Sequence, residues 1–234
     1  IFLSRFLQMA KKVDYSGFSL RKLNDPRFSH LKLLGGWIAY FLLYVLTENL
    51  IPPEKCHPIH CWLDDLIPFN EFFLIFYCGW FLLVFFSLLY TLLTDVENFK
   101  KLQIFIMCTQ AIAMFCYIVY PSRQDLRPEV FPRQNILTAL MAFIYRVDTS
   151  TGVCPSLHAG YSFAILSVAW KDRNLKRIRK ILLTFLVVMI CLAVCFVKQH
   201  SAVDVFAAMI MCLFIEIALY GKNYWLPRLR GKNA

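Results

Sequence analysis

The run "ILLTFLVVMICLAVCFVKQ", residues 181–199, is almost uninterrupted in its apolar character and predicts a helix that crosses a membrane. Such a helix needs about 20 mostly apolar residues. Similar runs occupy 31–51, 72–94, 101–120, 155–170 and 201–220, of which 155–170 is the shortest. With 59% hydrophobic residues and a mean hydropathy of +0.56, the chain is too apolar for a single globular core. We therefore predict an all-α, polytopic membrane protein with six transmembrane helices.

A thirteen-residue stretch before the fourth run, "NILTALMAFIYRV" at 135–147, is too short to span and predicts an interfacial or re-entrant helix. The chain then divides into three parts. Residues 1–30 form an N-terminal membrane-surface segment, 31–221 a six-helix membrane catalytic domain, and 222–234 a basic cytoplasmic tail.

Lysine and arginine predict the orientation, because they gather in cytoplasmic loops. The segment "KDRNLKRIRK", 171–180, lies directly before the quoted run. Counting spans from it places the N-terminal segment, the loop with Lys100 and Lys101, and the tail on the same, cytoplasmic side. The formal net charge of +10 then indicates anionic lipid headgroups rather than nucleic acid. The sequence does not indicate an oligomeric state.

The connection 121–153 breaks this rule, because it falls on the outer side and still carries four arginines. One interpretation is an anionic ligand at that surface; the other is pairing with nearby carboxylates. The arginines are Arg123, Arg127, Arg133 and Arg146, and the carboxylates are Asp125, Glu129 and Asp148.

Two polar motifs interrupt the apolar pattern on the same outer side. "PSLH", 155–158, opens the fourth run with a serine and a histidine, and "HSAVD", 200–204, joins the fifth run to the sixth. His200 and Asp204 are four residues apart, so on a helix they share one face. The carboxylate can then fix the imidazole tautomer and leave the other nitrogen as a nucleophile. His158 can protonate a leaving group, and arginines and a helix N-terminus can hold phosphate.

Each residue also has a plainer interpretation. A histidine at the end of a span is often a headgroup-level residue, Ser156 can simply cap a helix, and Lys198 can extend to lipid headgroups. His30, His57 and His60 are expected to be non-catalytic, and Glu216 is given no role. The hexapeptide "CHPIHC", 56–61, is compatible with a plain loop, a Cys56–Cys61 disulfide or, with awkward geometry, zinc.

These motifs together resemble the type 2 phosphatidic acid phosphatase superfamily of integral membrane enzymes. Its first block, Lys-x6-Arg-Pro, is similar to "YPSRQDLRP", with Arg127 and Pro128 matching. Its second, Pro-Ser-Gly-His, is similar to "PSLH", and its third, Ser-Arg-x5-His-x3-Asp, is similar to "AVCFVKQHSAVD", with His200 and Asp204 matching.

The sequence departs from the family pattern at three places. Tyr120 stands for the first-block lysine, Leu157 for the second-block glycine, and Ala193 and Val194 for the third-block Ser-Arg pair. Arg123 and Lys198 are the candidate replacements for the missing cations. "LHAG" without the Ser-Arg pair also resembles the sphingomyelin and inositol phosphorylceramide synthase branch.

The resemblance implies a lipid phosphatase acting on a lipid phosphate or diphosphate at the outer face. His200 would attack phosphorus to form a phosphohistidine, Asp204 would orient it, and His158 would protonate the leaving oxygen. Arg127, Ser156, Lys198 and Arg123 would bind phosphate. No metal or cofactor is expected. The alternatives are a headgroup phosphotransferase and, from another class, a transporter or channel that uses the same residues as a proton relay.

Overall fold

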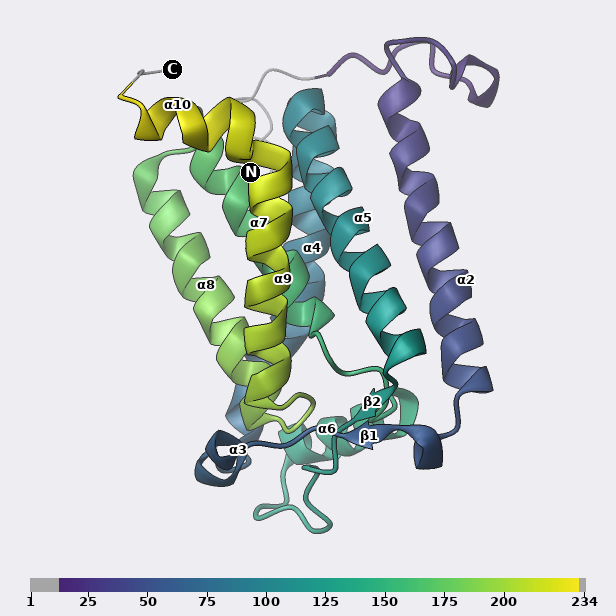
Figure 1. The fold of residues 1–234 in the computed structure, drawn as a ribbon, viewed down its shortest axis with the longest axis vertical. Coiled ribbons are helices and arrows are strands. Elements are labelled where there is room, and N and C mark those ends of the chain that lie inside the picture. Colours follow the sequence, from purple (N-terminus) through teal and green to yellow (C-terminus); the bar gives the residue numbers. More distant parts are fainter. Residues whose placement is uncertain (1–12, 232–234) are drawn as a thin grey trace.

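The structure is a computed structural model that describes residues 13–231. The N-terminal part of the predicted surface segment, 1–12, and the last three residues of the predicted tail lie outside the described residues. Most of the described chain is helical (Figure 1). The elements are η1 (Leu20–Lys22), η2 (Ser29–Leu34), α2 (Gly35–Leu50), η3 (Pro53–Lys55), β1 (His57–Pro58), α3 (Trp62–Leu66), η4 (Glu71–Phe73), α4 (Leu74–Thr94), α5 (Val96–Val119), β2 (Ser122–Arg123), α6 (Ile136–Val147), α7 (Leu157–Lys171), α8 (Arg177–Phe196), α9 (Ala202–Tyr220), the π-helix η5 (Gly221–Trp225) and α10 (Leu226–Leu229).

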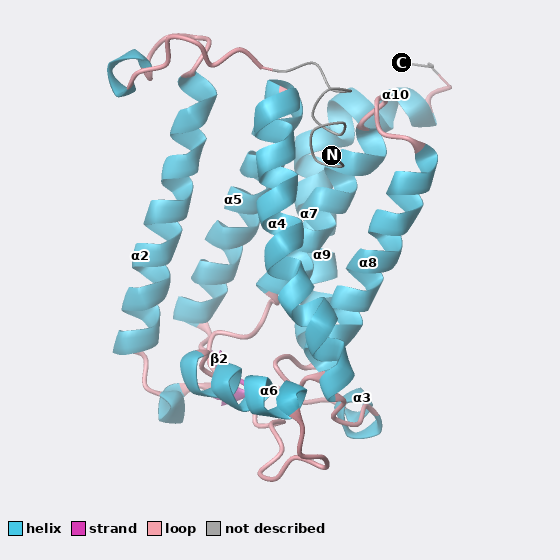
Figure 2. Ribbon diagram, turned by 180° about the vertical axis from the view of Figure 1, so that it is seen from behind, coloured by secondary structure: helices cyan, strands magenta, loops and turns pink. Residues whose placement is uncertain are grey.

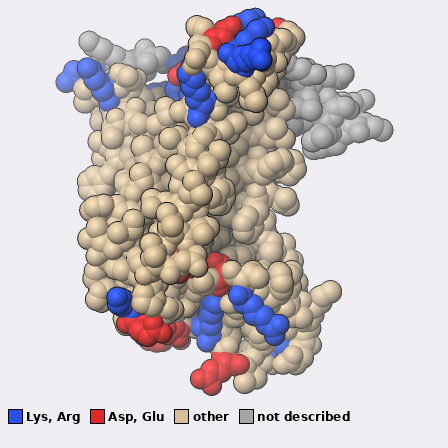
Figure 3. Space-filling view, turned by 90° about the vertical axis from the view of Figure 1, so that its right-hand side faces the viewer, with Lys and Arg blue, Asp and Glu red and all other residues tan. Residues whose placement is uncertain are grey.

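Five helical stretches are long and apolar enough to cross a membrane, which confirms the prediction of an α-helical membrane-type chain. They are Ser29–Leu50, Glu71–Thr94, Val96–Val119, Arg177–Phe196 and Ala202–Leu229. On the face shown in Figure 3, the surface between the two ends of the bundle is largely free of charge. Large apolar side chains project from it, such as Phe115 and Phe214. A surface of this kind is suited to hydrocarbon rather than water.

Helix α7, at the predicted fourth span, is different because it has only 15 residues and is mostly buried. It packs against α4, α5, α8 and α9. Small residues allow this close packing, as is usual between membrane helices. A Cβ atom on Gly160 would lie 3.3 Å from Met211 Cε of α9. The central position of α7 matters because His158 lies in its first turn.

One end of the bundle, which we call the site end, is closed by α6, α3 and the strands β1 and β2. The helix predicted at 135–147 is present as α6, and it lies across this end of the bundle (Figure 2). Glu71, fully buried, fastens its start by accepting hydrogen bonds from Asn135 Nδ2 and Arg133 Nη2, both at 2.9 Å. Strands β1 and β2, which the sequence pattern did not predict, pair in parallel with His57 opposite Ser122.

The opposite end, which we call the basic end, holds η1, the α4–α5 and α7–α8 connections and α10 (Figure 1). The four predicted cytoplasmic segments therefore share one end, as far as they are described. The arginine-bearing connection 121–153 lies at the site end. Residues 13–15 pack on the end of α4, where Val13 N donates to Leu93 O at 2.9 Å and Tyr15 Oη to Leu92 O at 2.8 Å.

The helix that follows the site runs on beyond the predicted end of the last span. α9 continues through η5 and α10 to Leu229, so most of the predicted 222–234 tail is helical. The physical reason is a contact within that helix: Trp225 Nε1 donates to Glu216 Oε1 at 2.6 Å. At Gly221 the helix changes from α to π and turns, so that α10 lies across the end of the bundle (Figure 1).

Candidate active site

Three residues from the two polar motifs meet at the site end. His158 Nδ1 lies 3.2 Å from His200 Nε2, and His200 Nδ1 lies 3.2 Å from Asp204 Oδ2. The two histidines are 42 residues apart in the chain. The motifs are also joined through the backbone, because Ser156 N donates to Asp204 O at 3.0 Å. The structure thus brings together all three residues that the sequence assigned to catalysis.

The His200–Asp204 pair arises differently from the expected shared helix face. α9 begins at Ala202, so His200 precedes the helix and Ser201 is its N-cap. Asp204 occupies the third helical position, and its Oδ2 also accepts from Ser201 N at 3.0 Å. This is a capping box, in which the acidic side chain turns back to the start of the helix. The cap therefore aims the carboxylate at His200.

The triad is well shielded from solvent. His200 is 7% exposed and Asp204 is fully buried. The His158 ring lies against the Trp80 ring, with centroids 4.3 Å apart, and the Tyr77 ring at 4.8 Å. A carboxylate that accepts Nδ1–H from His200 leaves Nε2 with its lone pair, the tautomer that a nucleophile needs.

Ser156 and Cys154 lie beside the triad. Ser156 is fully buried, and its Oγ accepts from Ala159 N at 3.5 Å as the N-cap of α7. Burial and then the nearby Asp204 carboxylate raise the pKa of the Cys154 thiol to about 12, so this thiol stays protonated. No feature of the sequence singles out Cys154 from the other cysteines in apolar segments.

Arg127 lies next to the triad through Gln199, but its donors are already in use. Burial lowers the pKa of its guanidinium, which the carboxylate of Asp148 partly offsets. The group also lies over the Tyr145 ring, 4.5 Å from its centroid. Only Nε is buried without a partner. Its hydrogen bonds go to Tyr145 O (3.0 Å), Asp148 O (2.9 Å), Thr149 O (2.8 Å) and Gln199 Oε1 (2.7 Å).

A polar network that the sequence interpretation missed connects Arg127 to His158. Gln199 Nε2 donates to Asp148 Oδ2 at 2.8 Å, and Tyr77 Oη donates to the same oxygen at 3.0 Å. Tyr77 belongs to α4, and its ring faces His158. The sequence marked Asp148 only as a possible arginine partner, and Gln199 lies next to His200 in the motif, whereas Tyr77 carried no signal.

The two residues proposed as replacement cations contact other groups. Lys198 Nζ donates to Asp64 O at 2.9 Å and to Ile67 O at 2.5 Å. Arg123 donates to Asp125 Oδ2 at 3.1 Å and to Pro53 O at 2.9 Å. Both side chains therefore hold parts of the site end together in this structure.

Asp64, also missed, fixes the start of α9. Burial alone would raise the pKa of this carboxyl, but hydrogen bonds from Ser201, Ala202 N and Cys61 N lower it. Its Oδ2 accepts from Ser201 Oγ at 2.6 Å, and its Oδ1 from Ala202 N at 2.8 Å. Because Ser201 follows His200 directly, Asp64 holds the turn that carries His200 in place.

We expect Lys198→Ala to lower both the melting temperature and the activity. The buried carbonyls of Asp64 and Ile67 would lose a charged donor, and an unpaired buried polar group costs about 1–3 kcal/mol. Lys198 has φ 54°, in the left-handed region. Lys198→Gly removes the same side chain, but glycine adopts this backbone conformation readily. The glycine variant should therefore have a higher melting temperature than the alanine variant. The measurement is thermal unfolding followed by intrinsic fluorescence, with kcat/KM determined on the same samples.

A different result would support the original prediction that Lys198 binds phosphate. Wild-type melting in Lys198→Ala, together with a loss of roughly tenfold or more in kcat/KM, would indicate an ammonium that binds substrate.

The hexapeptide 56–61 is not a plain loop, because His57 and Pro58 form strand β1. All nine cysteines of the chain fall within the described residues and are free, including Cys56 and Cys61. His57 stacks on Tyr120 and His60 pairs with Asp65 at 2.8 Å. Among residues 13–231, no cluster of three or more His, Cys, Asp or Glu side chains is arranged to hold a metal ion.

Searches with this chain find no matching protein-family model, no matching curated protein and no matching solved structure.

Proposed function

We propose that this protein is an integral membrane lipid phosphatase that hydrolyses a lipid phosphate or diphosphate through a phosphohistidine, as in the type 2 phosphatidic acid phosphatase superfamily that its motifs resemble. The observation that carries the proposal is the His158–His200–Asp204 chain of contacts at 3.2 Å. A nucleophile beside a base-orienting carboxylate, with an acid facing it, is the arrangement that nucleophilic catalysis requires.

The reaction takes place between the two histidines. Substrate phosphate separates the rings, and the negative charge that it brings favours the protonated form of His158. His200 Nε2 attacks phosphorus, the bond from phosphorus to the lipid oxygen breaks, and His158 gives its proton to that oxygen. Water then attacks the phosphohistidine, returning a proton to His158 and releasing inorganic phosphate. The Asp204 carboxylate stabilises the positive charge on His200 throughout.

Phosphate oxygens need donors, because charge spreads over them in the transition state. The α7 N-terminus, with Ser156 as its cap, presents backbone N–H groups at the position of His158. Arg127 contacts Gln199, the residue before His200, and only its Nε lacks a hydrogen-bond partner among the described residues. Lys198 and Arg123 can bind phosphate only if they give up their hydrogen bonds to backbone carbonyls. We therefore propose that their main role is to stabilise the structure of the site end.

We propose six spans, with α7 as the fourth. Its 15 residues measure about 22 Å at 1.5 Å per residue, less than the roughly 30 Å of hydrocarbon. The shortfall is at the site end, where α6 and the connection before α7 cover it. We place the basic end in the cytoplasm and the site end outside, because lysine and arginine concentrate at cytoplasmic loops.

Headgroup transfer is the alternative, and the burial of the nucleophile favours it. His200 is 7% exposed, which restricts water and would allow a lipid alcohol to take the phosphoryl or headgroup phosphate instead. The same triad serves both reactions, and only the acceptor differs.

The assay that tests the proposal uses purified protein in detergent with phosphatidic acid, phosphatidylglycerol phosphate and a polyprenyl diphosphate, each with and without a chelator. We expect inorganic phosphate from at least one substrate, at a rate that the chelator leaves unchanged. Adding diacylglycerol or ceramide, with a phospholipid as headgroup donor, tests transfer. Headgroup transfer without phosphate release would show that the protein is a headgroup phosphotransferase and not a phosphatase. Neither product from any substrate would contradict both.

The proposed orientation predicts which cysteine substitutions react from outside an intact cell. Glu129→Cys at the site end should react with an impermeant maleimide, and Asn174→Cys, between α7 and α8, only after permeabilisation. Peptide mass spectrometry separates these sites from the native cysteines. Labelling of position 174 in intact cells would reverse the orientation.

A further inference from the structure

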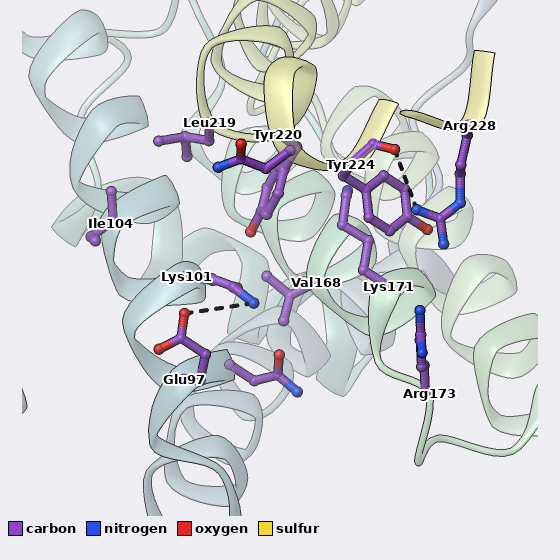
Figure 4. Close-up of a pocket in the computed structure, with 12 residues that line it drawn as sticks. Glu97, Lys101, Ile104, Val168, Lys171, Arg173, Leu219, Tyr220, Tyr224 and Arg228 are labelled. Carbon is purple, nitrogen blue, oxygen red and sulfur yellow. Dashed lines mark hydrogen bonds and ion pairs between the residues drawn. The ribbon is translucent and has the colours of Figure 1, made fainter. Parts of the chain in front are cut away.

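A second site lies at the basic end, far from the triad. A cavity of about 540 Å³ lies between α5, α7, α9 and the C-terminal helices (Figure 4). His158 is in the first turn of α7, whereas Lys171, which lines the cavity, is its last residue. About 20 Å of helix separates them at 1.5 Å per residue.

The cavity wall is strongly basic. It contains the four cations Lys101, Lys171, Arg173 and Arg228, and one carboxylate, Glu97. Glu216 stands behind Lys171 as its ion-pair partner. Lys101, Lys171 and Arg228 against these two carboxylates leave a net charge of +1. Lys101 lies 3.7 Å from Glu97, a long contact on an exposed helix face that contributes little.

Lys171 is held as a fixed cation. Its ammonium pairs with Glu216 and donates to Ser167 Oγ at 2.8 Å. It also lies 4.2 Å from the Tyr220 ring centroid and 5.2 Å from that of Tyr224. Aromatic faces stabilise a cation without neutralising it. The charges of Arg228 and Lys101 also act on Lys171. Glu216 offsets part of this like-charge repulsion on Lys171.

The hydroxyl of Tyr220 is an independent sign of a polar ligand. The residue is 7% exposed, and its Oη is buried without a hydrogen-bond partner among the described residues. In Figure 4 its ring points from α9 toward Lys101, into the space that the cations surround. A buried hydroxyl without a partner is uncommon, because it forfeits the hydrogen bond it would make in water.

We propose that this cavity binds the phosphate group of an anionic phospholipid. Lysine, arginine and a tyrosine hydroxyl are donors suited to phosphate oxygens. The lipid source is favoured over a free phosphate compound because Ile104, Val168 and Leu219 complete the wall and Ile104 is 38% exposed. A headgroup can therefore lie among the cations while its chains follow the apolar surface of the bundle.

The test compares lipid retention by native mass spectrometry. His200→Ala protein, which removes turnover, is reconstituted in nanodiscs of phosphatidylcholine with or without phosphatidylglycerol. Lys101→Gln and Tyr220→Phe are added on this background, with Lys100→Gln as the matched control. Lys100 is the neighbouring residue, carries the same charge and does not line the cavity.

We expect the parent to retain phosphatidylglycerol over phosphatidylcholine, and Lys101→Gln and Tyr220→Phe to weaken that retention by about tenfold each, while Lys100→Gln does not. Tyr220→Phe removes only the hydroxyl and keeps the ring, so we expect it to fold. It therefore tests the proposal even if Lys101→Gln is unstable. Equal retention by the parent and both variants would overturn the proposal. A third outcome is that inorganic phosphate stabilises delipidated protein but not Tyr220→Phe, while no variant retains phosphatidylglycerol. That outcome would contradict the lipid proposal and identify a soluble phosphate compound as the ligand.

Discussion

His200→Ala is expected to reduce turnover of the lipid phosphate by at least about 10⁴-fold. In enzymes that act through a covalent intermediate, removing the nucleophile costs on the order of 10⁶ in kcat, with residual activity from binding alone. His200 is the residue whose Nε2 faces His158 while its Nδ1 is held by Asp204. Steady-state phosphate release measures the effect. Quenching with detergent at alkaline pH, with ³²P-labelled substrate, should trap a phosphoprotein that is stable in base and labile in acid, and only in the wild type.

The matched control is His57→Ala, since His57 also lies at the site end but stacks on Tyr120 and is exposed. It should retain wild-type turnover. His158→Ala should lose most activity with an alkyl phosphate and less with an aryl phosphate, because a good leaving group needs little protonation. Substantial turnover in His200→Ala would show that the nucleophile is another residue.

The second large effect is expected at Asp204. Asp204→Asn should lower kcat by about 10⁴-fold, as the comparable change does in a serine-protease triad, because the neutral amide no longer stabilises the positive charge that His200 acquires when it attacks phosphorus. The amide oxygen can still accept from Ser201 N, which Asp204 Oδ2 does at 3.0 Å. The capping box and the fold should therefore survive, and the loss should appear in kcat rather than in the melting temperature.

Two comparisons make that result specific. Asp204→Ala also removes the cap, which adds about 1 kcal/mol of destabilisation, so it should melt lower than Asp204→Asn. Asp65→Asn, an exposed carboxylate paired with His60, should leave kcat unchanged. If Asp204→Asn turned over substrate normally, the carboxylate would be only a helix cap.

The sequence by itself determined the helices and the motif residues. The apolar runs at 72–94 and 181–199 became α4 and α8 within a few residues, because length and hydropathy are local properties and a helix satisfies its own backbone hydrogen bonds. The His200–Asp204 spacing also allowed their pairing, although a capping box rather than a shared helix face produces it.

Only the tertiary structure decided how the polar side chains are used. His158 meets His200 because α7 lies against α8 and α9. Lys198 turns to the carbonyls of Asp64 and Ile67, from a segment more than 130 positions away, and not to the triad. Arg127, predicted to bind phosphate, meets three backbone carbonyls first. Long charged side chains have many partners within reach, and the packing of distant segments determines which partner each one contacts. That partner cannot be predicted from residue type and spacing alone.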